Sequence, residues 1–566
     1  MPTEKRASGG WFSDRGDRTL IVLSILIGVV VGLTTVAFML LTGRLAARMY
    51  PPESAAWRRL VVPVLGSLVS GLLLFRYFPN ARGSGIPQTK FAIFLRDGYI
   101  PLKTALGKFL CCSISLASGI ALGREGPSVQ IGAGISSVIG RRFGLSTAQV
   151  KALVPVGCSA ALAAAFNTPI AAVLFSLEEI LGDMHAPVLG SVVLSSATSW
   201  MVLHLLLGDD PLFHPPAYKL VHPLEFGIYA ALGIVGGLAS VCFVKLLLKI
   251  RHWFMKLPKM TVWIQPVAGG LLVGAVGWFV PGILGVGYDF VDRVLEGDVA
   301  LKTVLLMAAL KIIATPVCYS SGNAGGIFGP SLYIGATTGA AVGSIAHALL
   351  PGVTGGPGAY ALVGMGAAFA GIVRTPLTSV IMIFEMTRDY SIIVPLMIAN
   401  LVSFFISRRL QPEPIYEALA LQEGVHLPSG ASREEFAGIR VGDILDREAA
   451  LLPEEAGFEE AKVFLAEKAC NSWPVGDSAR CVRGVVAMQQ IETAPPGATL
   501  VRDLLDGEHE FPHVHMDHAA SQVLERMRRR GVDSMPVVSR TDIHELLGIV
   551  TLSGILSAYK MKAGAN

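Results

Sequence analysis

KFLCCSISLASGIALGREGPSVQIGA, residues Lys108 to Ala133, returns 203 positions later as KIIATPVCYSSGNAGGIFGPSLYIGA, residues Lys311 to Ala336. The glycines and the proline of the two stretches stay in register, and both stretches are apolar enough for a lipid bilayer. At the aligned position where the first stretch has Glu125, the second has Phe328. The chain therefore contains an internal duplication in which one copy carries a charge that the other lacks.

A second pair of segments extends this duplication. Residues 157–178 (GCSAALAAAFNTPIAAVLFSLE) align with residues 364–385 (GMGAAFAGIVRTPLTSVIMIFE) at an offset of 207, with a Thr-Pro pair at the same place in each. Two related halves, at about 19–208 and 225–420, are predicted. Duplicated halves in transporters commonly meet near the membrane midplane, where helices end around the substrate.

The composition indicates a polytopic membrane protein with a soluble tail. A chain of 566 residues with a mean hydropathy of +0.57 is too long and too apolar for one soluble domain. From Ala431 onward, 15 Lys and Arg stand against 21 Asp and Glu, a net charge of −6 that leaves +10 for the rest. Apolar runs, several of them long enough to span a bilayer, lie at about 19–42, 59–75, 187–207, 226–248, 264–286, 300–314 and 391–407.

Basic residues beside the apolar runs predict the topology. Arg408 and Arg409 follow the last strong apolar run. Four basic residues precede the first apolar run: Lys5, Arg6, Arg15 and Arg18. Both termini are therefore expected in the cytoplasm, and the first run is expected to remain as a helix rather than to be cleaved as a signal peptide. The seven cysteines lack the spacing of a disulfide framework or a metal site, so reduced thiols are expected.

The chain divides into a membrane domain and two smaller units. An all-α membrane domain is predicted at 1–424 and a linker at 425–437. The segments 438–495 and 497–562 each contain a V-x-D-[IL]-L turn, a charged helix and two short strands, which predicts an α/β pair.

Three glycine- and proline-containing segments stand before apolar helices: GSGIP at 83–87, GREGP at 123–127 and GGIFGP at 325–330. Glycine lets the backbone approach an ion closely, and proline suits the first helical turn. The free amide N–H groups and the helix dipole then bind an anion without a full positive charge. Three such helix starts favour an anion path, because a cation path would use rings of carboxylates or carbonyls.

Glu125 lies in the second of these segments. A carboxylate at the bilayer centre costs on the order of 3 kcal/mol, so it needs a partner, and a ring of amide donors is one. Ionised Glu125 could occupy an anion site, and protonated Glu125 would leave it, so proton and anion binding would be linked. A helix-start carboxylate with a purely structural role is the alternative.

With these motifs in this order, and with Tyr416 in the presumed exit helix PEPIYEALALQEG (412–424), the chain resembles the CLC chloride channels and proton-coupled chloride transporters. The resemblance runs from about Arg18 to Met561. It implies the CLC fold, in which two inverted-topology repeats with broken helices form the membrane domain. It also implies a homodimer with one anion path in each subunit.

The resemblance further implies roles for particular residues. The external gating glutamate would be Glu125, and the internal proton-transfer glutamate would be Glu179. Adjacent acids point in different directions on a helix, so Glu178 and its repeat counterpart Glu385 are expected to be structural. The chloride-binding groups would be the hydroxyls of Ser84 and Tyr416 and the backbone amides of Gly83, Ser84, Ile327 and Phe328, with Lys108 and Arg124 as basic residues near the path.

The function implied is Cl⁻/H⁺ exchange in a prokaryotic inner membrane, with chloride, protons and lipid as partners. No enzymatic activity, cofactor, metal or nucleic acid is expected. Glu179 favours exchange over a passive chloride channel, because the family's channels usually have an apolar residue there, but the channel stays open as an alternative. A divalent-cation channel would need acidic pore rings, and acids are scarce in the apolar runs; a non-transporting membrane sensor is the third alternative.

The paired units of the tail resemble CBS domains, which often bind adenine nucleotides between them. The ribose-binding aspartate of that family is replaced by Gln490 and Gly554, although Thr551 is retained. A dimerising or regulatory module is therefore expected, with nucleotide binding as the less favoured alternative. The cluster His509, His513, His515 and His518 is expected to be a solvated loop, against a metal site or a pH sensor.

Overall fold

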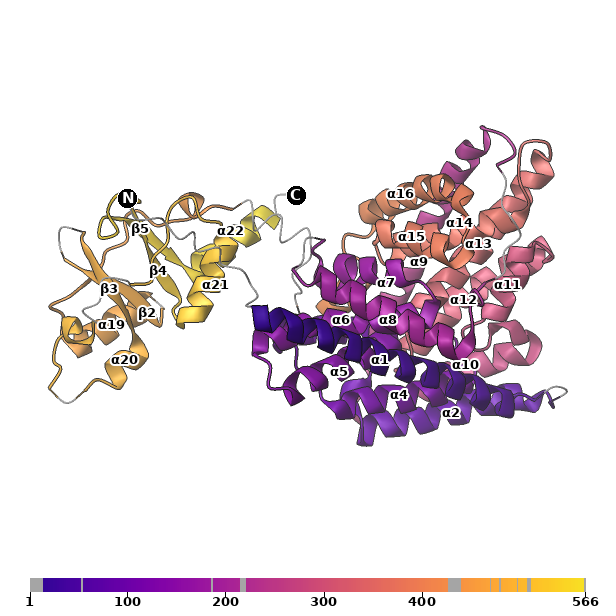
Figure 1. Ribbon diagram of the computed structural model, residues 1–566, viewed down its shortest axis with the longest axis horizontal. Helices are drawn as coiled ribbons and strands as arrows, with labels where there is room; N and C mark the ends of the chain where they lie inside the picture. The colour runs from indigo at the N-terminus through magenta and orange to yellow at the C-terminus, as the bar shows by residue number, and fades with distance from the viewer. Residues whose placement is uncertain are drawn as a thin grey trace. The chain divides into compact units, whose positions relative to one another are not determined.

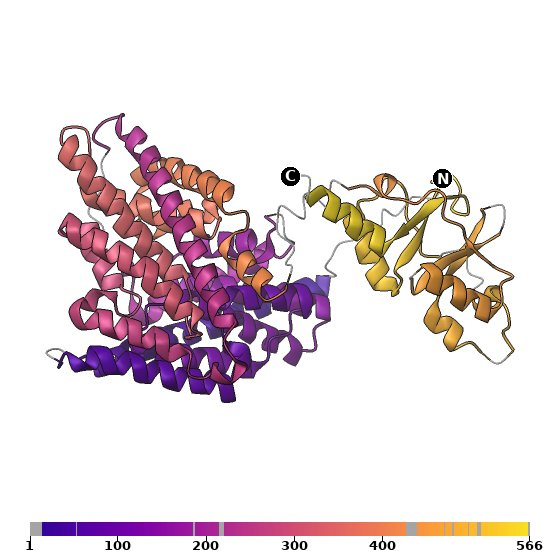
Figure 2. The ribbon, with the colours of Figure 1, turned by 180° about the vertical axis from the view of Figure 1, so that it is seen from behind.

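The computed structural model describes residues 14–51, 54–184, 187–213, 220–425, 439–468, 470–477, 480–495, 497–505 and 511–563. The chain divides into two compact units, residues 1–427 and 428–566. Within the described ranges, the first unit is built from helices, and strands occur in the second alone (Figures 1 and 2).

The α-helices of the first unit differ widely in length, from 36 residues in α1 to 7 in α7. The helix α7 continues directly into a π-helical turn, η2 (Ser176–Leu181), and short 3₁₀ turns lie at Pro79–Ala81, Lys259–Thr261, Pro281–Ile283 and Tyr390–Ile392. Eight of the spans in the described residues are long and apolar enough to cross a membrane. The α-helices are α1 (Asp14–Met49), α2 (Trp57–Arg76), α3 (Ile86–Leu95), α4 (Leu102–Ala117), α5 (Glu125–Arg142), α6 (Thr147–Phe166), α7 (Pro169–Phe175), α8 (Leu189–Leu207), α9 (Glu225–Met255), α10 (Pro266–Phe279), α11 (Tyr288–Glu296), α12 (Leu301–Ser320), α13 (Phe328–Leu349), α14 (Pro357–Ile372), α15 (Pro376–Thr387), α16 (Ile393–Leu410) and α17 (Ile415–Gln422).

The two predicted halves repeat the same close helix crossing. In the first half α5 packs against α6, and a Cβ added to Gly132 would lie 2.2 Å from the carbonyl oxygen of Gly157. In the second half α13 packs against α14, and a Cβ added to Gly335 would lie 2.4 Å from the carbonyl oxygen of Gly364. Glycine is required at these crossings because the facing backbone occupies the space of a side chain.

The halves meet through reciprocal hydrogen bonds at the repeated motif. The N–H of Gly123 donates to the carbonyl of Gly326, and the N–H of Gly326 donates to that of Gly123, both at 2.7 Å. Contacts exchanged in this way are those of an approximate two-fold axis. The starts of α5 and α13 therefore lie beside each other near the centre of the membrane unit.

A second reciprocal contact caps two short helices. Glu178 accepts from the N–H and the hydroxyl of Thr378 at the start of α15, at 2.8 and 2.6 Å. Glu385 accepts from the N–H groups of Ile170 and Ala171 at the start of α7, at 2.9 and 2.7 Å. Each half thus caps a helix of the other, which is the structural role expected of both glutamates.

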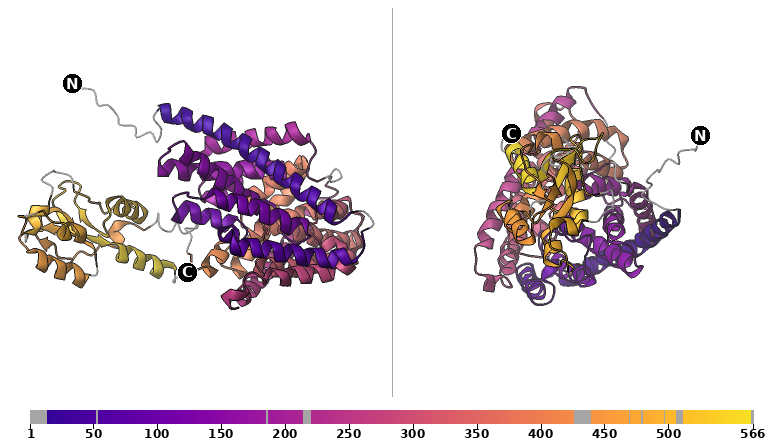
Figure 3. Two further views of the ribbon diagram at one scale, coloured as in Figure 1. Left: turned by 90° about the horizontal axis from the view of Figure 1, so that it is seen from below. Right: turned by 90° about the vertical axis from the view of Figure 1, so that its left-hand side faces the viewer.

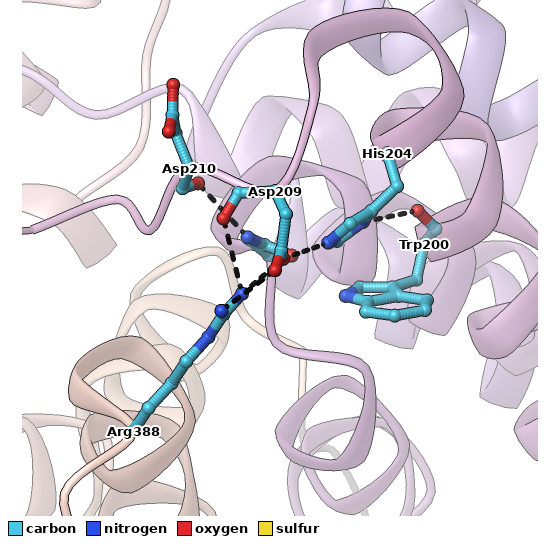
Figure 4. Close-up of polar contacts among 6 residues, drawn as sticks. Trp200, His204, Asp209, Asp210 and Arg388 are labelled. Carbon is cyan, nitrogen blue, oxygen red and sulfur yellow. Dashed lines mark hydrogen bonds and ion pairs between the residues drawn. The ribbon is translucent and has the colours of Figure 1, made fainter.

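A polar cluster links the loop after α8 to the end of α15 (Figure 4). Asp209 accepts from Arg388 Nη1 at 3.0 Å and from the ring of His204 at 2.5 Å, and the His204 ring packs on Trp200. Hydrogen bonds from Arg388, and then from His204, lower the pKa of Asp209 to about 2. Because the Asp209 side chain is 61% exposed, the cluster fixes the loop more than it stabilises the fold.

The second unit consists of two small sheets with flanking helices. The sheet β1–β2–β3 pairs β1 in parallel and β3 antiparallel with β2, and β4 pairs antiparallel with β5. Figure 3 shows these strands and helices from two further sides. The elements are β1 (Leu452–Pro453), α19 (Phe458–Lys468), β2 (Ser472–Gly476), β3 (Val482–Ala487), α20 (Met488–Glu492), α21 (Ala520–Arg530), β4 (Ser534–Val538), β5 (Leu546–Thr551) and α22 (Leu552–Ala563), with 3₁₀ turns at Val441–Asp443 and Val501–Leu504.

The leading turn of each sequence repeat packs on the other repeat. Val441 lies in the core that contains β4 and β5, and Val501 lies in the core that contains β2 and β3. Isolated bridges join Asp446 to Ile549 and Gly457 to Leu500. The predicted segments 438–495 and 497–562 are therefore repeats of sequence whose cores are shared.

Candidate functional site

The three predicted motif segments converge on one place. A Cβ on Gly85 would lie 2.3 Å from the carbonyl oxygen of Gly126, and one on Gly126 would lie 2.4 Å from the carbonyl oxygen of Ser84. A Cβ on Gly326 would lie 3.2 Å from the amide nitrogen of Gly126. The helix starts of α3, α5 and α13 are thus in backbone contact, as an anion site made of amide groups requires.

Glu125 is fully buried at the first position of α5, yet its carboxylate binds the opposite half. Its Oε2 accepts from the N–H of Gly329 in the first turn of α13 at 3.2 Å, and its Oε1 accepts from the hydroxyl of Tyr288. The guanidinium Nε of Arg124 lies 3.8 Å from Oε1, and the same guanidinium lies 5.5 Å from the centre of the Tyr288 ring. The carboxylate therefore takes the place at the start of α13 that an anion would take.

Ile327 and Phe328 precede Gly329 at this helix start and are buried. In the described part of the chain, no backbone carbonyl accepts from their N–H groups, as expected for the first residues of a helix. The Phe328 ring contacts Phe166 and Phe369, with ring centroids 4.8 and 4.4 Å apart. Two amide groups without a backbone acceptor thus lie beside a cluster of aromatic rings.

Two buried hydroxyls belong to the same region. The Ser84 hydroxyl lies in the turn before α3 and the Tyr416 hydroxyl in the first turn of α17. Among the described residues neither makes a hydrogen bond of ordinary geometry, although the Ser84 hydroxyl lies near the Tyr319 side chain. Electrostatic interactions of the Tyr416 hydroxyl reach both Glu125 and Glu179. A buried hydroxyl without a partner is costly unless a ligand accepts from it, so both residues fit an anion as cargo.

Gly83 and Lys108 form the other side of the Ser84 turn. The buried ammonium of Lys108 donates to the Gly83 carbonyl at 2.7 Å and so fixes the turn. Gly83 also lines a cavity of about 420 Å³ whose basic lining residues are Arg82, Arg96, Arg251 and Lys259, and whose acidic lining residue, Glu423, is paired with Arg251. Basic side chains in a cavity that reaches this turn favour an anion there.

Glu179 is the acid of the Glu178–Glu179 pair that binds Lys90 of α3. It lies in the π-helical turn η2, is 6% exposed and accepts from Lys90 Nζ at 2.9 Å. Lys90 Nζ is also 3.8 Å from Glu417 Oε1. Thus both predicted glutamates are buried and bonded, and each has a partner that the sequence motifs did not single out: Tyr288 for Glu125 and Lys90 for Glu179.

Tyr288, Lys90 and Glu417 are the contacts that sequence reasoning missed. The sequence did contain a signal for two of them, because each is a charged residue beside a predicted site motif. Lys90 follows the GSGIP segment at 83–87, and Glu417 comes directly after Tyr416. Nothing near Tyr288 in the sequence marks it as a partner of Glu125.

These features define a class: a membrane transport protein in which broken helices from two related halves enclose a candidate anion site. A family model described as voltage gated chloride channel matches residues 66–408, and a CBS domain model matches residues 501–560. The chain belongs to the voltage gated chloride channel family, the CLC family, and carries a CBS domain in its tail. The predicted fold class is confirmed.

Relatives and solved structures agree with this assignment. The chain is 30% identical over 428 residues to the H⁺/Cl⁻ exchange transporter ClcA of Vibrio cholerae, which covers 72% of this chain and 90% of that protein. It is similar to a crystal structure of a slow cyanobacterial Cl⁻/H⁺ antiporter, with 27% identity, a TM-score of 0.66 and coverage of 71% and 97%. The fold of a eukaryotic CLC transporter matches with a TM-score of 0.67 at 21% identity and covers 94% of this chain and 97% of that one.

In the tail, the retained Thr551 has a structural contact. Its hydroxyl accepts from the N–H of Gly554 at 3.0 Å and so caps the start of α22. A cavity of about 540 Å³ in the first repeat is lined by four carboxylates and one arginine, which does not favour a phosphate. Nucleotide binding by this pair remains the less favoured alternative to a dimerising or regulatory role.

The histidine cluster is partly buried, not fully solvated. His509 lies outside the described residues. The His515 ring bonds the Val538 carbonyl at 3.0 Å, and the N–H of His515 donates to His518 Nδ1 at 3.2 Å. Among the described residues, no group of three or more His, Cys, Asp or Glu side chains is placed to hold a metal ion. Burial, together with the nearby Arg526, lowers the pKa of His518.

Proposed function

We propose that this protein exchanges chloride for protons across a membrane, with Glu125 as the group that links the two ions. The observation that carries the proposal is the bond between the Glu125 carboxylate and the N–H of Gly329 at the start of α13. Ser84 and Tyr416 supply buried hydroxyls that can donate to an anion in the same region. Relatives named as H⁺/Cl⁻ exchange transporters support chloride as that anion.

The linkage follows from competition for one set of donors. Ionised Glu125 and chloride carry the same charge, so both are attracted to the amide groups of α13, and they exclude each other. Protonation neutralises the carboxylate and releases the donors to chloride. Proton uptake and chloride uptake at this place are then reciprocal effects of one coupling free energy.

Glu179 provides the internal end of the proton route in this proposal. It is buried, and the Tyr416 hydroxyl interacts electrostatically with both Glu179 and Glu125. Its neighbour Glu178 is bonded to Thr378 at the start of α15 and is therefore committed elsewhere. A proton that reaches Glu179 from the cytoplasm can continue to Glu125, while chloride moves the opposite way.

The experiment that tests exchange uses the full-length protein reconstituted in liposomes. An outward chloride gradient should drive protons inward against their own gradient, and protein-free liposomes should show no such uptake. A passive chloride channel would pass chloride without moving protons uphill, and that result would make the exchange proposal wrong.

Glu125→Gln tests the role of this side chain. The substitution keeps the size of the side chain and removes its titration, so chloride should still pass and proton transport should disappear. Glu385→Gln is the matched control, because it alters a helix-capping carboxylate bonded to Ile170 and Ala171. Unchanged proton coupling in Glu125→Gln would remove Glu125 from the mechanism.

We also propose a prokaryotic inner membrane, cytoplasmic termini and a homodimer with one chloride path in each subunit. Arg408 and Arg409 in the last turn of α16 support a cytoplasmic tail, because basic residues are enriched on that side. The family resemblance supports the dimer, with the CBS pair as a regulatory or dimerising module. Cross-linking in native membranes tests the dimer, and protease access from each side tests the topology.

A further inference from the structure

Lys90 is a buried cation that the mechanism above does not use. It lies in α3 and is 5% exposed. Its ammonium donates to Glu179 at 2.9 Å and lies 3.8 Å from Glu417. The Glu179 side chain is 7% exposed and the Glu417 side chain is 17% exposed. We call Lys90, Glu179 and Glu417 the Lys90 triad.

The triad differs from the other buried lysines of the membrane unit. Lys108 and Lys311 occupy equivalent places in the repeat, and their ammonium groups donate to backbone carbonyls, those of Gly83 at 2.7 Å and Gly285 at 2.8 Å. Such lysines hold the backbone in place. Lys90 instead contacts two carboxylates, so its effect falls on groups that bind protons.

The net charge of the triad favours the binding of one proton. With all three side chains ionised, one lysine faces two carboxylates and the net charge is −1. A buried net charge is costly, and one added proton makes the cluster neutral. The triad is therefore suited to hold a single exchangeable proton.

The triad also joins the proton route to the anion site. Lys90 lies in α3, the helix that follows the turn with Ser84, and Glu417 follows Tyr416 in α17. The helices α3 and α17 are in contact, and α3 also contacts the turn η2 that carries Glu179. The helix that follows the Ser84 turn, the helix that carries Tyr416 and the turn that carries Glu179 thus meet around Lys90.

We propose that Lys90 is a positioning residue for proton transport and that the internal proton site is the Lys90 triad rather than Glu179 alone. This inference rests on the proposed exchange of chloride for protons. Lys90 holds the Glu179 carboxylate and balances its charge, while Glu417 competes for the same ammonium and keeps the proton exchangeable.

Other charged or titratable groups surround the triad. Glu178, next to Glu179, is bonded to Thr378, and Lys151 of α6 lies over the Phe94 ring of α3. Glu417 also interacts electrostatically with Arg374 and Glu413, and Glu179 with the Tyr416 hydroxyl. Within 4.0 Å of Lys90 Nζ, the charged partners in the described residues are Glu179 and Glu417.

The test uses full-length protein in liposomes and measures chloride-driven proton transport as a function of cytoplasmic pH. Lys90→Gln removes the cation, so Glu179 holds its proton more tightly and the pH midpoint should rise by about one unit, a tenfold change in proton affinity. Glu417→Gln removes the competing carboxylate, and the midpoint should fall. Lys90→Arg keeps the charge and should stay near the wild-type midpoint.

Opposite shifts in Lys90→Gln and Glu417→Gln, with chloride flux retained, support the triad. Unchanged midpoints, or shifts in the same direction, overturn it, since a merely structural lysine would reduce the amount of folded protein without moving the midpoint. If Lys90→Gln does not fold, Glu417→Gln decides the question: a lowered midpoint supports the triad, and an unchanged or raised midpoint overturns it. Absence of proton transport in the wild type would instead refute the proposed exchange.

Discussion

Tyr288→Phe is the most direct test of how Glu125 is held. The Tyr288 hydroxyl donates to Glu125 Oε1, and its ring packs edge-on against Phe213 with centroids 5.4 Å apart. Phenylalanine keeps the ring, its packing and its contact with the Arg124 guanidinium. The substitution therefore removes one hydrogen-bond donor from a buried carboxylate and changes little else.

The size of the effect on Glu125 follows from the hydrogen-bond donors that its carboxylate loses and keeps. Glu125 retains the N–H of Gly329 at 3.2 Å and the looser Arg124 contact at 3.8 Å. A hydrogen bond to a charged group contributes about 1.5–3 kcal/mol. At 1.4 kcal/mol for each factor of ten, the ionised side chain should lose about 10- to 150-fold in its occupancy of the α13 start. Chloride, which competes for this place, should bind more tightly by up to the same factor.

Isothermal titration of chloride into the purified protein at neutral pH measures this change. Tyr288→Phe should lower the Kd for chloride by about tenfold, which corresponds to the lower limit of the hydrogen-bond estimate. In the Glu125→Gln background the same substitution should leave the Kd unchanged, because the competing charge is already gone. An unchanged Kd in the wild-type background, or an equal decrease in both backgrounds, would refute the reasoning.

Two further predictions concern stability. Gly132→Ala should lower the thermal midpoint of the purified protein by the equivalent of about 1–3 kcal/mol, because its Cβ would lie 2.2 Å from the Gly157 carbonyl oxygen; Gly227→Ala, where a Cβ meets nothing within 4 Å, should not. Burial lowers the pKa of His518, so the folded tail favours the neutral ring, and this stability should be lost as pH falls below about 6.5, the unfolded value. Hydrogen exchange of tail amides across that range should show the loss, and His518→Asn should flatten it. Equal midpoints in the two glycine variants, or an unflattened pH dependence, would contradict the respective prediction.

The convergence of helix starts was predictable from the sequence because the motifs record backbone geometry. Gly83 and Gly85 have φ of +89° and +104°, which glycine adopts at no steric cost. Gly126 lies against the carbonyl oxygen of Ser84, where no side chain fits. Since such requirements are local, a glycine pattern is enough to locate them, and its duplication also predicts the reciprocal contact of the two halves.

The partners of the acidic side chains could not be predicted in the same way. Tyr288 and Glu125 are 163 residues apart, and Lys90 and Glu179 are 89 apart. Each of these bonds depends on how α11 or α3 packs against another element, and a single sequence contains no record of such pairs. The sequence could therefore identify the carboxylates whose burial costs free energy, but it could not identify the hydrogen-bond donors that offset this cost.

The duplication explains why the site has one carboxylate and not two. The reciprocal bonds between Gly123 and Gly326 place the starts of α5 and α13 side by side, so equal residues in both halves would face each other across the axis. A second carboxylate at the position of Phe328 would put two like charges beside one set of amide donors, and one of them would have to stay protonated. Phe328 instead closes the site among Phe166, Phe175 and Phe369. One half thus supplies a movable charge, and the other half supplies fixed amide donors in an apolar wall. Competition between a carboxylate and chloride depends on this difference between two otherwise similar halves.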